Sequence, residues 1–319
     1  MLGISLLIDR QSDTEQGHRM IADRPLIGIL FMVGFCVFAP MGDAAAKSIG
    51  LVTPLIVLLL ARYLTQWLMP LPLILITGRK LRMTSQVARV VVIRSAVHIV
   101  GTAAMFAAYR YLPLADALAI AFVYPFIMLL MGWALLKEKV GVRRLVACTV
   151  GFIGTLLIVQ PSFAAVGPPA LLPLLVAFLF ASLVLLTRQI AKDYDPISLQ
   201  SVSGLTSALM LIVLWAAASG TGLPDLQLIT PTGSQAAILL MVGVFGTLAH
   251  LGMSYAVRFA PSTTLAPMQY VELPVATAIG WAVFGELPNG MAAAGITITV
   301  IAGLAVILFE HRAIARAAR

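Results

Sequence analysis

The sequence predicts an all-α membrane protein whose ten transmembrane helices form two inverted repeats of five, with both termini in the cytoplasm. Composition is the first of three observations behind this fold: 61% of the 319 residues are hydrophobic, 11% are charged, and the mean hydropathy is +1.01. A soluble domain carries about 25% charged residues. In lipid only helices and closed barrels satisfy every backbone polar group, and barrel strands are short and alternating. The long apolar runs of this chain therefore indicate helices.

Those runs are the second observation. A transmembrane helix needs about 20 mostly apolar residues, and turn-forming sequences such as "TGRK" and "LPNG" separate ten segments of this kind. The expected spans are 25–46, 53–77, 88–110, 113–137, 141–160, 169–190, 196–219, 235–257, 261–285 and 290–310. Residues 1–24 and 311–319 are expected to form cytoplasmic tails.

The orientation follows from the lysines and arginines. With the N-terminus inside, 17 of the 21 fall in cytoplasmic segments, whereas Lys47 and Arg110 lie at outer ends and Arg62 and Arg94 lie within spans. Such a bias is typical of cytoplasmic loops, and an even number of spans returns the C-terminus to the cytoplasm. The net charge of +8 therefore indicates basic loops, and no nucleic-acid partner is expected.

The third observation is an internal repeat. A shift of 148 residues places "YRYLP" (109–113) on "VRFAP" (257–261) and Glu138 on Glu286. The repeating unit contains five spans, an odd number, so its second copy enters the membrane inverted. The first repeat is expected over 25–161 and the second over 168–310. Inverted repeats are typical of secondary transporters, whose halves move around a site near the midplane; a duplicated structural protein is the alternative.

Glu272 is the most unusual residue of these spans. It lies near the centre of span 261–285, where an ionisable side chain costs about 2.5–3.5 kcal/mol and usually faces the bundle interior. Pro267 and Pro274 flank it, and each removes a backbone hydrogen bond, so this span is expected to bend. Glu272 is interpreted as a site residue or, alternatively, as a structural partner of Arg62 or Arg94.

Other polar side chains also fall within the spans: Asp43, Lys47, Arg62, Arg94, His98, Tyr124, His250, Gln269 and Tyr270. Tyr124 is the repeat counterpart of Glu272, and Arg94 and His98 share one helix face. Asp43 and Lys47 are four residues apart and form either a self-neutralising ion pair or a coupling site. The alternative interpretations are snorkelling for Arg94, a hydrogen-bonded filling role for His98 and His250, and ordinary packing for Tyr124.

The sequence lacks the motifs that are typical of ATP binding, of serine hydrolases and of metal sites. It contains no G-x-x-x-x-G-K-[ST] loop and no G-x-S-x-G elbow, and its four histidines have no metal-ligand spacing. No catalytic residue, metal or cofactor is therefore expected, and the protein is not expected to be an enzyme. An intramembrane enzyme that uses Glu272 and His98 as acid and base remains a remote alternative.

Two stretches resemble a known family. Residues 109–161, from "YRYLPLADALAIAFVYPF" onward, resemble the first repeat of the EamA-type transporters of the drug/metabolite transporter superfamily, and 258–304, with "APMQYVELPV", resemble the second. The likeness extends over about 25–310 and implies a fold of ten helices in two inverted repeats.

Within that family, "GDAAAKSIG", "ARYL", "IRSAVHIVG" and "APMQYVEL" look most like the S-adenosylmethionine uptake and riboflavin transporter branches. Those branches carry Asp-x-x-x-Lys in helix one, an arginine in helices two and three, and Tyr-x-Glu in helix nine. In this sequence the matching residues are Asp43, Lys47, Arg62, Arg94, Tyr270 and Glu272. In the S-adenosylmethionine branch the resemblance implies a basic residue at position 269, whereas this sequence has Gln269.

These observations lead us to expect a multi-pass secondary active transporter in the bacterial inner membrane. It would move a small polar metabolite, similar to S-adenosylmethionine or riboflavin, by alternating access. Arg94 would bind a carboxylate or phosphate, and Glu272 would bind a cationic group or carry a coupling proton. The residues expected to supply hydrogen bonds and stacking are His98, Tyr124, His250, Gln269 and Tyr270.

Alternatives of the same fold are an exporter of amino acids or of other metabolites. A non-transporting membrane scaffold is a remote alternative. A proton as the coupling ion and a homodimer are both compatible with the sequence, although no interface residue can be identified from it.

Overall fold

A computed structural model describes most of the chain between residues 24 and 305. The described residues are 24–137, 141–142, 145–146, 149–154, 156–157, 166–287, 290–291, 293–298, 301–302 and 305. Within these ranges the chain forms helices and no strands, which confirms the all-α class. The expected spans 141–160 and 290–310 are described only in part, and both expected tails, apart from Arg24, fall outside the described residues.

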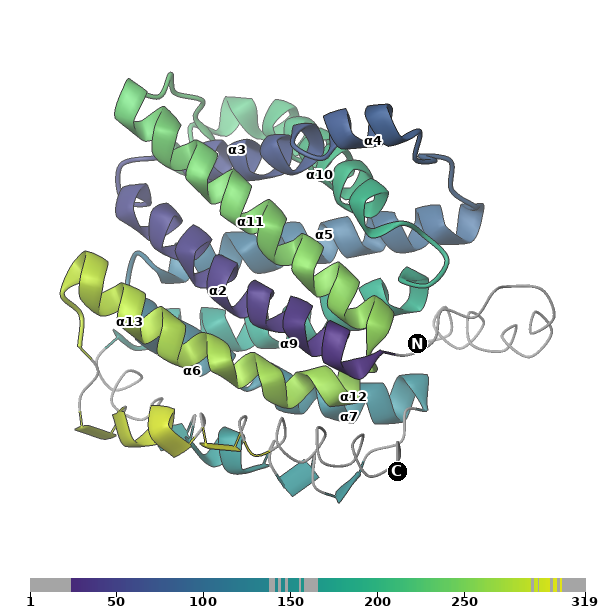
Figure 1. Cartoon of the computed structure of the whole chain (residues 1–319). Helices are drawn as coiled ribbons and strands as arrows, with labels where there is room; N and C mark the ends of the chain where they lie inside the picture. Colours follow the sequence, from purple (N-terminus) through teal and green to yellow (C-terminus); the bar gives the residue numbers. More distant parts are fainter. Residues whose placement is uncertain are drawn as a thin grey trace.

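The described helices form a layered bundle (Figure 1). The α-helices are α2 (Pro25–Ile49), α3 (Leu55–Leu68), α4 (Leu71–Thr77), α5 (Ser85–Ala108), α6 (Leu114–Ala121), α7 (Tyr124–Leu136), α9 (Leu172–Ile190), α10 (Pro196–Ala218), α11 (Gly233–Phe259), α12 (Ser262–Leu265) and α13 (Glu272–Phe284). Short 3-10 turns are η1 (Pro168–Leu171), η2 (Ser219–Thr221), η3 (Pro224–Leu226) and η4 (Ala266–Val271).

Seven helical stretches among the described residues are long and apolar enough to cross a membrane. They are 25–49, 55–77, 85–108, 114–134, 168–190, 196–218 and 233–259, and each coincides with an expected span. Their ends differ from the expected ones by a few residues.

Three of the ten expected spans are interrupted rather than continuous. The segment 53–77 divides into α3 and α4 around Pro70, and 113–137 divides into α6 and α7 just before Pro125. The segment 261–285 divides into α12, η4 and α13. Proline supplies no N–H, so a helical hydrogen bond is missing at each of these places, which accounts for the interruptions. Consequently α7 begins at Tyr124 and α13 begins at Glu272, so both residues stand at helix N-termini in the interior.

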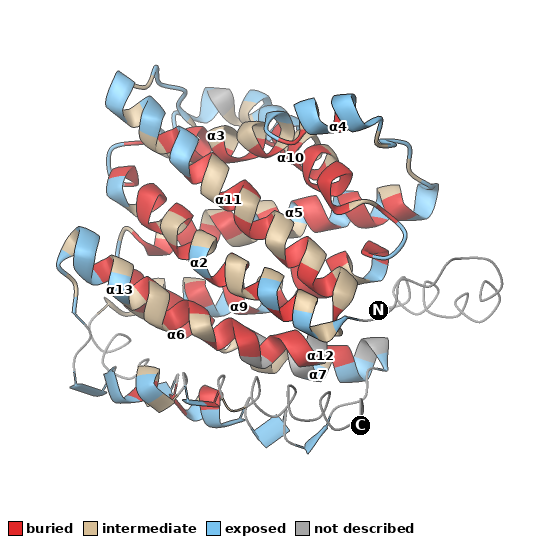
Figure 2. Cartoon of the chain, in the orientation of Figure 1, coloured by how far each residue is buried: buried red, intermediate tan, exposed pale blue. Residues whose placement is uncertain are grey.

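Helix packing brings distant segments together. In Figure 1 α2 lies along α11, and further contacts join α5 to α9 and α3 to α10. Figure 2 shows buried residues along α2, α5 and α11 and exposed residues at α4 and at the outer end of α13. Glycine permits close approach between helices: a Cβ atom on Gly204 of α10 would lie 2.5 Å from the backbone nitrogen of Trp67 in α3.

Two faces of the bundle can be distinguished by their contacts. At the N-terminal face, where α2 begins, the backbone N–H of Arg24 donates to Phe259 O at the end of α11 (2.8 Å). At the opposite face, Arg110 Nε after α5 donates to Gly50 O after α2 (2.9 Å). The seven long stretches therefore connect these two faces.

Two ion pairs join segments at the face opposite the start of α2. Lys47 Nζ lies 2.5 Å from Glu286 Oε1, and Arg110 forms a two-pronged pair with Asp225 at 2.7 and 2.9 Å. Of the two alternatives for Asp43 and Lys47, the self-neutralising pair is not formed in this structure: Lys47 reaches a glutamate 239 residues away, because α13 ends beside α2. Asp43 is left facing the interior.

Candidate functional site

A cavity of about 90 Å³ lies inside the bundle, enough for several water molecules. Helices α2, α3, α5, α6, α7, α9, α11 and α13 all contribute to its wall. The polar residues of this wall are Asp43, Arg62, His98, Thr102, Tyr124, His250 and Glu272. Phe35, Phe106 and Phe180 supply aromatic surface. The structure thus brings together six of the residues selected from the sequence.

Glu272 lies at the first turn of α13, where the helix dipole favours negative charge. Its Oε2 accepts a hydrogen bond from Tyr124 Oη at 3.2 Å, and the residue is 4% exposed. No Lys, Arg or His of the described chain lies within 4.0 Å of this carboxylate. The alternative role as a direct ion-pair partner of Arg62 or Arg94 is therefore wrong, and the carboxylate faces the cavity.

Arg62 supplies a cation to the same cavity. Its guanidinium lies over the Phe106 ring, 5.9 Å from the centroid, which is a cation–π arrangement. It also packs on Gly246 of α11, where a Cβ atom would lie only 2.4 Å from Arg62 Nη1. Gly246 thus makes room for Arg62, a role that no pattern in the sequence indicates because the two residues belong to distant spans.

Two histidines meet across the cavity. His98 Nε2 on α5 and His250 Nε2 on α11 are 3.1 Å apart, so one of them donates a hydrogen bond to the other. Each Nδ1 is buried and has no partner within the described part of the chain. The Tyr63 ring contacts His98 edge-on at 5.2 Å, and Phe35 contacts His250 in the same way at 6.0 Å. No local pattern predicts this pairing, because the histidines lie 152 residues apart.

Arg94 was expected to bind substrate, but in this conformation it does not line the cavity. It is 0% exposed, and it donates from Nε to Thr187 Oγ1 and from Nη1 to Ser203 Oγ, both at 2.8 Å. Its position one helical turn before His98 places it on the other side of the histidine pair.

Gln269 and Tyr270 are also buried outside the cavity wall. They belong to η4, and Tyr270 packs near Phe122 with a centroid distance of 5.9 Å. Both residues lie in the bend that precedes Glu272. The aromatic wall residues were missed from the sequence, since a phenylalanine in an apolar span is indistinguishable from ordinary packing.

The charge distribution of the cavity limits its chemistry. Two carboxylates, Asp43 and Glu272, share the space with Arg62 and two imidazoles. The described residues contain no group of three or more potential metal ligands. Such a site can bind a molecule that carries both positive and negative groups, and its phenylalanines can hold a flat or apolar part of that molecule.

Comparison with known sequences and structures identifies the family. The sequence model of the EamA-like transporter family matches residues 26–160 and 168–309, and the chain belongs to this family. It is therefore a multi-pass membrane protein of a transporter family. A protein whose crystal structure has been solved shares the fold, with a TM-score of 0.69, 16% identity, and coverage of 90% of this chain and 97% of the other.

Curated relatives carry two kinds of names. A riboflavin transporter of Brucella anthropi is 27% identical over 81% of this chain and 90% of its own, and one of Vibrio cholerae is 27% identical over 88% and 93%. An S-adenosylmethionine uptake transporter of Rickettsia prowazekii is 23% identical over 90% and 94%.

Proposed function

We propose that this protein is a secondary active transporter of a small polar metabolite similar to riboflavin or S-adenosylmethionine, located in the bacterial inner membrane. The observation that carries the proposal is the interior cavity, in which Asp43, Glu272, Arg62 and two histidines converge. An ionisable residue inside a membrane bundle is costly and usually serves a pathway for solutes or ions. The two candidate substrates are the compounds in the names of the relatives, riboflavin and S-adenosylmethionine.

Alternating access between residues 25–161 and 168–310 is the proposed mechanism, with both termini in the cytoplasm. Equivalent contacts support it: α2, the first helix of one half, packs on α11, the third of the other, while α9, the first helix of the second half, packs on α5. The interrupted helices α7 and α13 begin 148 residues apart, at Tyr124 and Glu272. Both correspondences are expected of two inverted repeats around a central site.

The roles of individual residues follow from their positions. Arg62 binds a carboxylate or phosphate of the substrate, because it is the arginine that reaches the cavity in this conformation. Glu272 and Asp43 bind a cationic group or a coupling proton. Tyr124, His98 and His250 donate or accept hydrogen bonds, and Phe35, Phe106 and Phe180 pack on the apolar part.

Counterflow into proteoliposomes tests this function. Vesicles preloaded with unlabelled riboflavin or S-adenosylmethionine are mixed with the labelled compound outside, and exchange is expected to accumulate label for one of the two. Empty liposomes and the non-matching compound are the controls. Label at the control level for both compounds, with protein that elutes as a single folded species, would contradict this substrate class and favour an amino-acid exporter. Absence of any solute flux would favour a scaffold.

A further inference from the structure

The cavity ends at a common level on the long helices that surround it. On α5 it is lined from Val97 to Phe106, on α9 from Val176 to Leu183, and on α2 from Phe35 to Asp43. α2 and α5 begin at the N-terminal face, whereas α9 ends there, so all three ranges avoid the parts of these helices nearest that face. The cavity therefore occupies the half of the bundle toward the opposite face.

His98, His250 and Phe35 form the floor of this cavity toward the N-terminal face. The histidines close it by their hydrogen bond of 3.1 Å, which joins α5 to α11, and Phe35 of α2 packs edge-on against His250. The bond is a direct polar link across this level between the two proposed halves. A single hydrogen bond between imidazoles contributes little net stability, because both partners can bind water instead. It is therefore suited to being broken and remade.

Arg94 lies directly beyond this floor, one turn closer to the N-terminal face than His98. Hydroxyl groups bind it, from Thr187 of α9 and Ser203 of α10, and no carboxylate of the described chain lies within 4.0 Å. Its Nη2 is buried and has no hydrogen-bond partner among the described residues. A buried guanidinium without a counter-ion is costly, so its retention there requires a reason outside this conformation.

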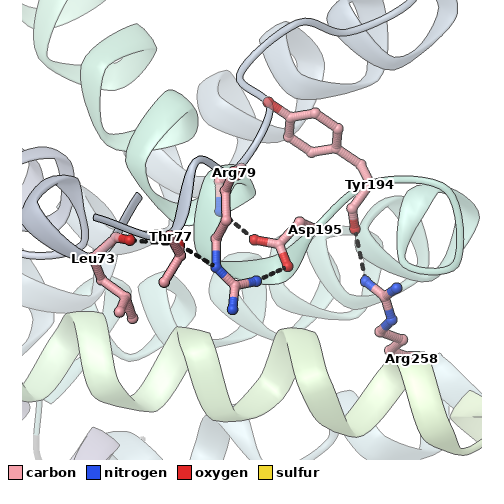
Figure 3. A network of polar contacts seen from close by, with 7 residues as sticks. Leu73, Thr77, Arg79, Tyr194, Asp195 and Arg258 are labelled. Atoms are coloured by element: carbon pink, nitrogen blue, oxygen red, sulfur yellow. Dashed lines mark hydrogen bonds and ion pairs between the residues drawn. The ribbon is translucent and has the colours of Figure 1, made fainter. Parts of the chain in front are cut away.

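A second closure lies between Arg94 and solvent at the N-terminal face. Arg79, after α4, pairs with Asp195, before α10, at 2.5 Å, and Arg258 at the end of α11 donates to Tyr194 O at 3.1 Å (Figure 3). Tyr194 Oη in turn donates to Leu81 O at 3.0 Å. The Arg79–Asp195 and Tyr194–Leu81 contacts join the two proposed halves and must also separate if this face opens.

We propose that the His98–His250 hydrogen bond is the gate between two alternate anion sites, Arg62 above the floor and Arg94 below it. When the pair separates and the Arg79–Asp195 and Tyr194–Leu81 contacts open with it, Arg94 becomes accessible from the N-terminal face and binds the anionic group that Arg62 holds in the present conformation. This proposal rests on alternating access in the proposed function. It explains why the described residues include two buried arginines and why Arg62, but not Arg94, reaches this cavity.

Thiol accessibility tests the gate without any substrate. In a background with Cys36→Ser and Cys148→Ser, Ser203→Cys reports on the space beside Arg94 and Thr102→Cys reports on the cavity. With the histidine pair intact, a membrane-impermeant thiol reagent is expected to label Ser203→Cys slowly, and only from the N-terminal face. Adding His98→Leu should accelerate that labelling about fivefold, the factor expected for one lost hydrogen bond, and should slow the labelling of Thr102→Cys.

His98→Gln is the matched control, because its amide can still hydrogen-bond to His250, and it should leave both labelling rates near those of the intact pair. His250→Leu removes the same bond from the other side and should reproduce His98→Leu. Unchanged labelling of Ser203→Cys in both leucine variants, or faster labelling of both reporters together, would overturn the gate, since the latter indicates general loosening. Because labelling needs no transported compound, failure of the gate is distinguishable from failure of the counterflow experiment.

Discussion

At the scale of single residues, the most unusual feature of the cavity is its two carboxylates. Neither Glu272 nor Asp43 contacts an oppositely charged side chain among the described residues. Glu272 accepts one hydrogen bond from Tyr124, and Asp43 faces the cavity because Lys47 is bound to Glu286. Interior carboxylates that the protein does not neutralise by ion pairing are available to a cation or a proton. This availability distinguishes them from Asp195, Asp225 and Glu286 at the two faces, each of which is bound to an arginine or a lysine.

Glu272→Gln is therefore expected to impair transport while preserving the fold. The amide keeps the shape and can still accept from Tyr124, but it cannot hold a charge or a proton. Loss of a charge-assisted hydrogen bond costs about 1.5–3 kcal/mol, which corresponds to roughly 10- to 100-fold weaker substrate binding or slower exchange. Counterflow and binding assays with purified protein measure both quantities.

The control for this variant is Asp193→Asn, which neutralises an exposed carboxylate in the turn after α9. It should exchange substrate at the rate of the unmodified protein. Exchange by Glu272→Gln at that same rate would remove Glu272 from the proposed site.

At the scale of elements, small residues decide how closely the helices approach. Hydrophobic burial adds little to the association of helices in lipid, so close packing contributes a larger part of the association free energy. Gly204 of α10 is the clearest case: an added Cβ atom would lie 2.5 Å from Trp67 N and 2.9 Å from Tyr63 O, both backbone atoms that cannot rotate away. Helix α3 also carries Arg62, so this contact positions a cavity residue.

Gly204→Ala is expected to destabilise the protein by about 1–3 kcal/mol, the range for an overpacked interior. Thermal unfolding in detergent should show a lowered midpoint. Gly34→Ala in α2 is the matched control, because no atom lies within 4 Å of its added Cβ. Alanine is the better helix former, so this control should be neutral or slightly stabilising. Equal midpoints for the two variants would show that α3 and α10 do not require the close contact.

At the scale of the whole molecule, ion pairs join the ends of helices from both proposed halves. Arg110, after α5, holds Asp225, between α10 and α11, through two hydrogen bonds, and Asp225 Oδ1 also accepts from Leu55 N. These hydrogen bonds lower the pKa of Asp225 below its ordinary value, the bonds from Arg110 being the main cause. The folded state therefore binds the Asp225 proton less readily than the unfolded chain.

The sign of the pH dependence follows from that shift. A lowered pKa in the folded state means that the pair stabilises the protein above the unfolded value of about 4 and that this contribution disappears as the pH falls through the folded value. The side chain of Asp225 is 49% exposed, so solvent screening limits the contribution to at most about 1 kcal/mol.

Asp225→Asn should consequently lower the unfolding midpoint at neutral pH and have progressively less effect as the medium is made acidic. Unfolding of both proteins from neutral to strongly acidic pH measures the difference. Asp193→Asn again serves as the control and should show no pH-dependent difference. A destabilisation by Asp225→Asn that persists unchanged at the acidic end would mean that the carboxylate acts through packing rather than charge.

Much of the fold was predictable because its signals are local. Apolar runs of sufficient length predict spans, and seven described stretches coincide with expected ones. The bend before Glu272 was expected from its prolines, whereas the division of α3 from α4 was not, since Pro70 was included within a span. Glu272 itself could be selected because a deep carboxylate is rare enough to need a function.

The sequence by itself determined the membrane-spanning helical class, the family and the set of interior polar residues from which the cavity is built. Only the tertiary structure decided their partners: Lys47 with Glu286 rather than Asp43, Arg62 rather than Arg94 in the cavity, and His98 with His250. The reason is physical. Helix formation and apolarity depend on neighbouring residues, whereas a contact across 152 or 239 residues depends on how each helix is rotated and crossed against the others.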